Sequence, residues 1–565
     1  MKMKTSRLLA TALALAATHS ALPVSAAETA AKRYNVVLII RDQEQGSLLA
    51  APGYKLPALD TLAARGVVFR QHYIASAMCS PSRAAFLTGL PPQRNGVFDQ
   101  MEETYTPSLD PAIPTMGTKF RQLGYTTAYF GKFEMLKEIL KVNGAVNYST
   151  ALRPFGFDVF SAHGDTGSEP NSGYDNDTLI AGEAVQWLRK EGLESKPGDK
   201  PFLMVASFIN PHDIMCADVN PPGETVQKSL VPGQMTTPPD NAIYRKQWDF
   251  KLPKSLGEKL DAPGMPSALA EYQRGWAGTL GEIPTDRPDM WKRFNNYYLN
   301  MIRDSDRTLQ QIVDVLNEQD LWKNTIVILT ADHGEMGGAH GGLSGKGPMA
   351  YEQNAHVPFI VVHPDFPPGT TDALTSHLDL LPTLIGMSGA PEPERRKAAA
   401  GLPGHDASVA LQPKMRKNVH AVRPGVLFNY VGPLTLDAGF CVSTLTKGSG
   451  GGNLATLKPQ LGKRGFLSFT YDGRYKFARF YAPNDFNAPK TLDELFAHND
   501  VQLFDLENDP EEMNNLALDR VKNAATLERM NALLNDLMAK EVGVNDGSFL
   551  PEAIRPAGVA PLKRP

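Results

Sequence analysis

Short apolar runs rich in β-branched residues alternate with helical segments between residues 36 and 362, and this alternation constrains the fold more than any other feature. The runs predict buried strands at Val36–Ile40, Thr126–Phe130, Phe202–Phe208, Thr325–Leu329 and Val357–Val362. Before the fourth run, residues 291–318 repeat apolar side chains at helical spacing and predict a long helix. This order indicates an α/β fold, with a mostly parallel central sheet flanked by helices.

The rest of the chain indicates how it is divided. Residues 213–289 are rich in proline and lack a regular apolar period, which is typical of long loops and predicts a substrate-loop insertion. Further on, Phe466–Tyr471 and Tyr475–Tyr481 flank Asp472-Gly473, a strong hairpin signal. We predict a catalytic domain at residues 33–420 and a smaller C-terminal domain with an antiparallel sheet at residues 421–565.

Residues 1–27 have the organisation of a secretory signal peptide. Basic residues precede the apolar stretch Leu8–Ala17, and Val24-Ser25-Ala26 resembles a cleavage site. We therefore expect export to the periplasm or the exterior. The alternative is an N-terminal membrane anchor, which needs a longer apolar run than this segment offers. No later segment is apolar enough to suggest a membrane span.

Charge and cysteine content exclude two classes of protein. Lys and Arg number 57 against 61 Asp and Glu, so the net charge of −4 gives no basic field for nucleic acid. The three cysteines, Cys79, Cys216 and Cys441, are too few for a disulfide scaffold. If Cys79 has a separate role, the other two either pair with each other or remain buried thiols.

Polar residues follow four of the predicted strands. In chain order they are Asp42 and Gln43, then Lys132, then His212, and finally Asp332 and His333. Any one of them could be an ordinary turn, cap or surface residue. Because ligands bind beyond the carboxyl ends of the strands in such sheets, we expect them to share one rim. Two carboxylates, an amide oxygen and an imidazole suit a divalent cation.

A short motif, Cys79-Ser80-Pro81-Ser82-Arg83, leads into a predicted helix. The N-terminus of a helix attracts anions, so the motif indicates an anion site. For Cys79 the alternative is a plain buried thiol.

With the trailing Leu87-Thr88-Gly89, this motif resembles the C-x-P-x-R signature of type I sulfatases, which are formylglycine-dependent members of the alkaline phosphatase superfamily. The resemblance continues in the family's order along nearly the whole mature chain. The further matching segments are Gly124-Tyr125, Gly131-Lys132, Pro211-His212, Asp332-His333-Gly334-Glu335-Met336 with His340, Gly341 and Lys346, and Leu503-Phe504-Asp505-Leu506 with Asp509-Pro510 and Asn515-Leu516.

The resemblance implies hydrolysis of a sulfate ester to an alcohol or phenol plus inorganic sulfate. A formylglycine-generating enzyme would convert Cys79 to formylglycine, which hydrates to a geminal diol. One hydroxyl would attack sulfur and form a covalent sulfo-enzyme, and the other would then expel sulfate by C–O cleavage. The substrate would be a small-molecule or saccharide sulfate ester; aryl, sugar and alkyl sulfates remain open, as does the oligomeric state.

The resemblance also implies roles for individual residues. The positions that match the metal ligands are Asp42, Gln43, Asp332 and His333. Calcium or magnesium is the first expectation, and manganese stays open because Gln43 stands where many members have a second Asp. Arg83, Lys132 and Lys346 would hold the diol and the sulfate oxygens. His212 would protonate the leaving alcohol.

Glu134 departs from the family pattern, because it stands where a histidine normally assists deprotonation of the diol. A carboxylate can serve as this base. Beside an anionic substrate it requires a raised pKa, a compensating cation or a side chain that points elsewhere. Two alternatives therefore stay open: a phosphonate monoester or phosphodiester hydrolase of the same superfamily, and a non-catalytic metal-binding relative with unmodified Cys79.

Overall fold

Strand β1 (Asn35–Arg41) forms the centre of the larger sheet. The computed structural model describes residues 32–47, 51–140, 148–161, 169–194, 200–446 and 457–562. All residues of β1 are buried, as expected of a strand that helices cover on both faces. It pairs in parallel with β5 (Phe202–Ser207) and with β6 (Thr325–Ala331). The carboxyl ends of these three strands therefore meet at one edge.

The larger sheet has eight strands and is mixed, with a mostly parallel arrangement. In spatial order they are β4 (Val159–Ser161), β3 (Thr126–Gly131), β5, β1, β6, β7 (Phe359–Val362), β2 (Val67–Tyr73) and β8 (Gly369–Ser376). Strand β7 runs antiparallel to β6 and to β2, and the other described pairs are parallel. The α/β architecture that the strand pattern predicts is thus confirmed.

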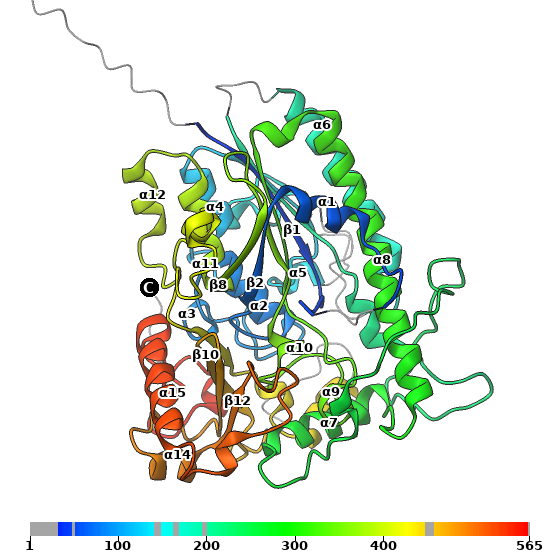
Figure 1. Ribbon diagram of the computed structural model, residues 1–565, viewed down its shortest axis with the longest axis vertical. Coiled ribbons are helices and arrows are strands. Elements are labelled where there is room, and N and C mark those ends of the chain that lie inside the picture. The colour runs from blue at the N-terminus through cyan, green and yellow to red at the C-terminus, as the bar shows by residue number, and fades with distance from the viewer. Residues whose placement is uncertain are drawn as a thin grey trace, which may run out of the picture. The chain divides into compact units, whose positions relative to one another are not determined.

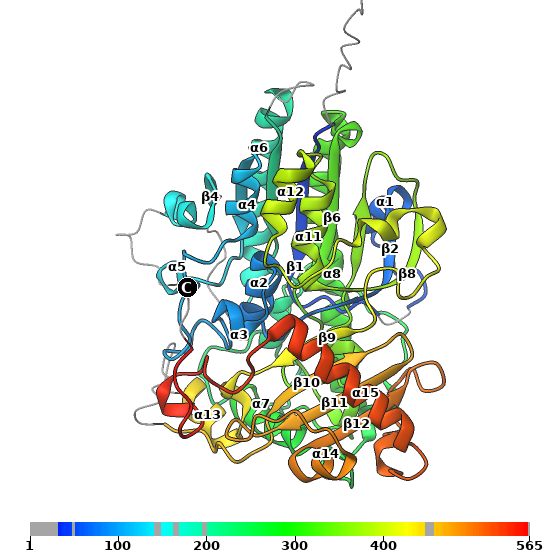
Figure 2. The same cartoon turned by 90° about the vertical axis from the view of Figure 1, so that its left-hand side faces the viewer.

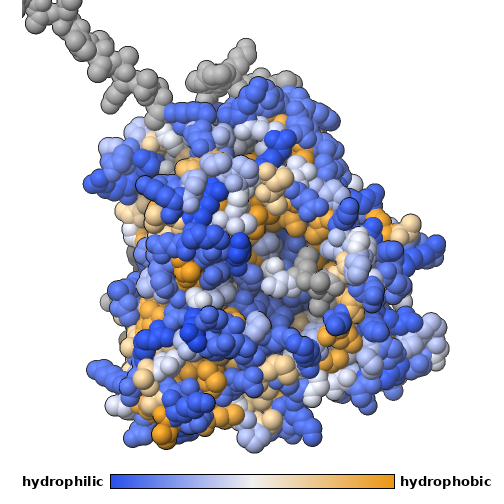
Figure 3. All heavy atoms as spheres, viewed as in Figure 1, coloured by the Kyte–Doolittle hydropathy of each residue, from blue (hydrophilic) through white to orange (hydrophobic). Residues whose placement is uncertain are grey.

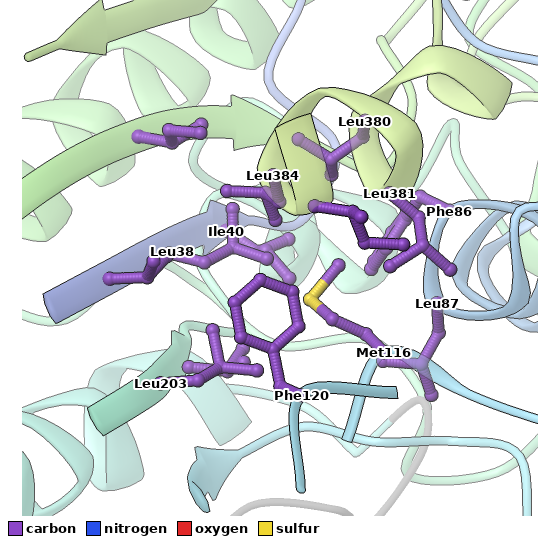
Figure 4. Packing of buried hydrophobic residues seen from close by; sticks show 14 of the residues in the cluster. Leu38, Ile40, Phe86, Leu87, Met116, Phe120, Leu203, Leu380, Leu381 and Leu384 are labelled. Carbon is purple, nitrogen blue, oxygen red and sulfur yellow. The ribbon is translucent and has the colours of Figure 1, made fainter. Parts of the chain in front are cut away.

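Successive residues of β1 point into two different cores. Val37 and Ile39 pack with α1 (Pro57–Arg65), α6 (Ser172–Glu194) and α8 (Pro288–Glu318) on one face. On the other face, Leu38 and Ile40 lie among side chains of α2 (Cys79–Thr88), α4 (Met116–Gln122) and α11 (His377–Met387) (Figure 4). This alternation is what a strand's two-residue period produces when both faces are buried.

The helices lie on both sides of the larger sheet (Figure 1). The other helices of the described residues, in both parts of the molecule, are α3 (Pro92–Asn95), α5 (Lys137–Leu140), α7 (Ser267–Leu280), α9 (Ala339–Gly342), α10 (Glu352–Ala355), α12 (Glu392–Ala399), α13 (Ala438–Thr446), α14 (Leu492–His498) and α15 (Ala524–Leu537).

A second, antiparallel sheet occupies the C-terminal region. Its strands, in spatial order, are β12 (Asp500–Asp505), β11 (Tyr475–Tyr481), β10 (Phe466–Tyr471) and β9 (Val426–Tyr430). Helix α15 packs on one face (Figure 2). On the other face, Phe428 and Phe469 pack against the loop that follows β6. Residues from Arg33 onward therefore form one compact unit that contains both sheets.

Most element predictions agree with the structure, and one range needs correction. The hairpin strands β10 and β11 have the predicted bounds, and α8 begins slightly earlier than predicted, because Pro288 fits the first helical position. Residues 213–289 are not loops throughout, because α7 lies among them. Its buried Tyr272 and Trp276 are four residues apart, so α7 has an inward face that the surrounding prolines obscured.

All three cysteines are free, buried thiols. Cys216 and Cys441 thus remain buried thiols and do not form a disulfide with each other. The expected signal peptide lies outside the described residues. Within the described part of the chain, no helix combines the length and apolarity of a membrane span. The face seen in Figure 3 is largely hydrophilic, with scattered hydrophobic patches.

Candidate active site

The strand-end residues meet where the carboxyl ends of β3, β5, β1 and β6 lie side by side. Asp42 and Gln43 follow β1, and Asp332 and His333 follow β6. His333 Nε2 lies 3.5 Å from Asp42 Oδ1 and 3.7 Å from Asp332 Oδ1. All four side chains are fully buried. The shared rim that the sequence predicts is therefore present.

Cys79 is the first residue of α2 and faces this group. Its Sγ lies 3.1 Å from His333 Nε2 and 3.8 Å from Asp42 Oδ1. Burial, together with the charges of Asp42 and Glu134, raises the pKa of Cys79 well above its usual value. The thiol is therefore neutral near pH 7.

Arg83 lies one turn further along α2 and joins the ends of several strands. Its Nη2 donates to Asp42 Oδ2 at 3.0 Å, and its Nε lies 3.0 Å from Asp332 Oδ2. Its Nη1 donates to the Lys132 carbonyl at 2.8 Å and to Ser207 Oγ at 2.9 Å. The guanidinium is thus held by the protein itself, and its expected contact with substrate remains a prediction.

Lys132 leaves β3 directly after Gly131, whose φ is +92°. A Cβ at Gly131 would lie 2.1 Å from the Ser207 carbonyl oxygen, so only glycine allows β3 to pass β5 this closely. Lys132 Nζ lies 2.7 Å from Asp42 Oδ2 and 2.9 Å from Glu134 Oε2. Of the possibilities open for Glu134, the structure thus shows the compensating cation.

Glu134 itself is buried, with a left-handed backbone at φ 52°. Gln100 Nε2 lies 3.5 Å from its Oε1. Burial and the charge of Glu134 raise the pKa of the nearby Glu102 to about 8. Glu102 therefore keeps its proton at neutral pH, which limits the negative charge in this corner of the site.

Gln43 and Lys346 meet through their side chains, and a third residue, Glu335, completes the contact. Lys346 Nζ donates to Gln43 Oε1 at 2.7 Å, and Gln43 Nε2 donates to Glu335 Oε2 at 2.5 Å. The sequence assigned no role to Glu335, although an acidic residue in the same strand-end loop as Asp332 was a usable signal. Helix α7 supports this loop, because Tyr272 Oη donates to the Ser344 carbonyl at 2.8 Å.

His212 is buried at the start of a short 3-10 helix, His212–Cys216, that follows β5. Burial, with the positive charges of Lys132 and Lys346, lowers its pKa well below the usual value. The loop that carries it is anchored by Asp213, whose carboxylate accepts from the backbone N–H groups of Gly173 and Tyr174. The imidazole is therefore neutral, and the segment that carries it is anchored by Asp213.

These donors fit a divalent cation. One ligand atom each from Asp42, Cys79, Asp332 and His333 lies within 4.8 Å of the others. Burial and the neighbouring Asp42 raise the pKa of Asp332 to about 7, because two carboxylates share this site. A cation between them would relieve that repulsion, and carboxylate and amide oxygens are ligands that hard cations prefer.

Comparisons with known proteins agree with this geometry. The sequence model of the family described as Sulfatase matches residues 34–390. The uncharacterized sulfatase YidJ of Escherichia coli K12 is 24% identical over 534 residues, which are 90% of this chain and 88% of that protein. Human arylsulfatase K is 27% identical over 422 residues, or 71% of each protein.

Solved structures share the fold. The phosphonate monoester hydrolase of Agrobacterium radiobacter aligns with a TM-score of 0.61 at 20% identity, over 90% of this chain and 96% of that one. BT4656, solved with its substrate D-glucosamine-2-N,6-O-disulfate, aligns with a TM-score of 0.58 at 18% identity, over 90% and 98%. Because the family model spans most of the chain, the chain belongs to the sulfatase family and is a sulfuric ester hydrolase.

Proposed function

We propose that this sulfatase cleaves a saccharide sulfate ester through a formylglycine diol made from Cys79 and a covalent sulfo-enzyme, with one divalent cation bound at the strand ends. One observation carries the proposal. The side chain of Cys79 ends 3.1 Å from His333, inside the group of donors that fits a cation. An oxygen nucleophile built at Cys79 would therefore stand next to the cation.

The state of the thiol supports a modified residue. The raised pKa of Cys79 keeps it neutral, and a neutral thiol is a poor nucleophile. An aldehyde at this position needs no thiolate, because it hydrates to a diol whose oxygen attacks sulfur. The formylglycine-generating enzyme of the host would supply this aldehyde.

The cation would be held by the carboxylates of Asp42 and Asp332, by His333 and by the Gln43 amide oxygen. We favour calcium, with magnesium or manganese as alternatives, because three of these four ligands offer oxygen. When bound, the cation would polarise a sulfate oxygen and favour the ionised diol.

The charged side chains around Cys79 would stabilise negative charge and transfer protons. Lys132 and Lys346 would supply positive charge where negative charge spreads over the sulfate oxygens, while Arg83 holds the two carboxylates in place. Glu134, held by Lys132, would take the place of the family's histidine as base. Once the negative charge of a bound sulfate offsets Lys132 and Lys346, His212 would take up a proton and pass it to the leaving alcohol.

The substrate class and the location rest on other support. BT4656, whose printed substrate is a sulfated glucosamine, has the same fold, and this favours a saccharide sulfate over a simple aryl sulfate. The basic and apolar order of residues 1–27 supports export to the periplasm or the exterior.

A phosphonate monoester or phosphodiester is the second candidate substrate. The structural likeness to a phosphonate monoester hydrolase and the presence of Gln43 and Glu134 favour it. Lys132 and Lys346, which face the site, suit a tetrahedral sulfate as well as a phosphonate or phosphodiester. Because the chain belongs to the sulfatase family, sulfate remains our first choice.

Three measurements on one preparation test the proposal. Protein made in a host with the formylglycine-generating enzyme should carry an aldehyde at position 79, seen by mass spectrometry of the tryptic peptide Gln71–Arg83. It should release sulfate from a sulfated glucosamine, and chelation followed by added Ca²⁺ should remove and restore this release. Intact cysteine without hydrolysis would refute the mechanism, and faster cleavage of a phosphonate monoester would favour the second candidate.

A further inference from the structure

Gln43 has an amide where a carboxylate is common in the family, and an amide has a direction. Its oxygen can approach a cation or accept from a lysine, whereas its NH₂ group would repel both. The side chain therefore supports the site in only one of its two orientations. The surrounding residues must select that orientation.

Glu335 provides the selection. Its Oε2 accepts from Gln43 Nε2 at 2.5 Å. Its Oε1 accepts from the backbone N–H groups of Gly337 and Gly345, at 2.9 Å and 2.8 Å. Because the two backbone N–H groups bind Oε1, Oε2 is the atom left to meet the Gln43 amide, and the NH₂ group of Gln43 lies against it.

The opposite end of the amide faces the site. Lys346 Nζ donates to Gln43 Oε1 at 2.7 Å and cannot accept a hydrogen bond from an NH₂ group. Gln43, Glu335 and Lys346 are all buried, so water cannot replace a lost partner. A reversed amide would therefore place donor against donor at Lys346 and acceptor against acceptor at Glu335.

The backbone of Gln43 is also fixed in place. Its φ of 70° is left-handed, which is uncommon for a residue other than glycine. Its N–H donates to Asp332 Oδ1 at 3.0 Å, and its carbonyl accepts from Tyr298 Oη at 2.6 Å. Because the backbone N–H and carbonyl of Gln43 are both held, the direction of its side-chain amide depends on the residues that contact that amide.

We infer that Glu335 is a positioning residue that orients the Gln43 amide, so that Oε1 faces Lys346 and the cation of the proposed function. It also holds the loop that carries Lys346, through the N–H of Gly345. The inference concerns the orientation of Gln43, and only its consequence for cation affinity rests on the proposed function.

The test replaces a carboxylate oxygen of Glu335 by an NH₂ group without changing the size of the side chain. Glu335→Gln places an NH₂ group opposite Gln43 and forces its amide to reverse. Crystals of this metal-free variant should show Lys346 Nζ displaced from hydrogen-bond distance to residue 43. Isothermal titration with Ca²⁺ should show affinity reduced by roughly 10- to 100-fold, as when other residues that support metal ligands are changed.

The double variant Gln43→Glu with Glu335→Gln exchanges carboxylate and amide and restores a donor facing an acceptor. We expect both the Lys346 contact and the Ca²⁺ affinity to return to wild-type values or better. Weak binding by the double variant, or an unchanged affinity in Glu335→Gln, would overturn the inference. So would a reduced affinity in Glu335→Gln with the Lys346 contact intact, because that result is a pure charge effect.

Two further outcomes remain decisive. If Glu335→Gln does not fold, recovery of a cooperative melt in the double variant supports the contact, and its absence overturns it. If the wild type binds no Ca²⁺, Mg²⁺ or Mn²⁺, the cation in the proposed function is wrong. The position of Lys346 in the variant crystals would still decide the orientation of Gln43.

Discussion

Arg83 and Arg423 are both fully buried among carboxylates, but they bind them with different geometry. Arg423 grips Asp379 with two parallel hydrogen bonds, at 2.9 Å and 2.7 Å, and donates to Glu541 Oε1 at 3.1 Å. Arg83 divides its nitrogens between Asp42 and Asp332. Its Nε reaches ion-pair distance from Asp332 Oδ2 without hydrogen-bond geometry, so that oxygen has no hydrogen-bond partner among the described residues.

The difference separates a cluster that holds the fold from one that serves a ligand. Around Arg423 the parallel fork satisfies both oxygens of Asp379 and ties α11 to the C-terminal segment. Around Arg83, Asp332 Oδ2 has only an ion-pair contact with Nε, and Asp332 Oδ1 lies 3.7 Å from His333 Nε2. Glu541 Oε2 in the Arg423 cluster also lacks a hydrogen bond among the described residues, so the Arg83 cluster is set apart by its place at the strand ends, beside Cys79 and His333.

The largest effect should come from the residue that the Arg83 cluster surrounds. Cys79→Ala removes the thiol that conversion to formylglycine requires, so no aldehyde or diol can form and kcat for sulfate release should fall by more than about 10³-fold. The melting temperature should change little, because one sulfur atom is lost. Cys441→Ala in α13 is the matched control and should retain activity; an active Cys79→Ala protein would refute the mechanism.

Arg83→Lys should reduce activity strongly and stability less. Lysine keeps the positive charge but has no planar fork, so it cannot hold Asp42 and Asp332 together. We expect kcat/KM to fall by roughly 10²- to 10³-fold, which is typical for loss of one aligned charged donor in an active site. Steady-state kinetics and thermal melts of the same sample measure both. Full activity would mean that Arg83 is as purely structural as Arg423.

Arg423→Lys should show the opposite pattern. Loss of the bidentate contact with Asp379 should reduce the free energy of unfolding by roughly 1–3 kcal/mol, the usual contribution of hydrogen bonds between charged groups. The folded fraction should keep its kcat, because α11 and Glu541 lie outside the site. Urea denaturation and kinetics below the transition check this. A reduced kcat with unchanged stability would contradict the comparison.

The sequence predicts the fold that holds these two clusters only in part. The continuous apolar run Val36–Ile40 predicts a central strand because both faces of β1 are buried, and the residues after it locate the rim. Strand β2 was not predicted, since Arg70 and Gln71 interrupt its apolar pattern. The antiparallel direction of β7 was not predicted either, because periodicity indicates burial and not direction.

In the candidate site, residue types were predictable and partners were not. The sequence indicates that Arg83 and Lys132 are cations near the anion site, but both bind carboxylates of the protein. It gives no role to Glu335, because the Gln43 contact joins residues 292 positions apart. Such pairings depend on the register of β1 and β6, which only the folded sheet defines.

The last prediction concerns the proton on Glu541. Burial raises its pKa to about 7, and Arg423 lowers it only partly because Asp379 already neutralises that guanidinium. The folded state thus holds a proton that the unfolded state releases near pH 4.5. Stability should therefore fall as pH rises from about 5 to 7, by about 1.4 kcal/mol per pH unit for this group.

Glu541→Gln removes this titration while keeping the size of the side chain and an oxygen that can accept from Arg423. The free-energy difference between variant and wild type should therefore shift in favour of the variant as pH rises from 5 to 7 and then stay level. Urea denaturation at half-unit pH intervals measures it. A free-energy difference that does not change with pH would contradict this prediction. It would mean that Arg423 keeps Glu541 ionised over this pH range, as a bound cation would keep the carboxylates of the Arg83 cluster ionised.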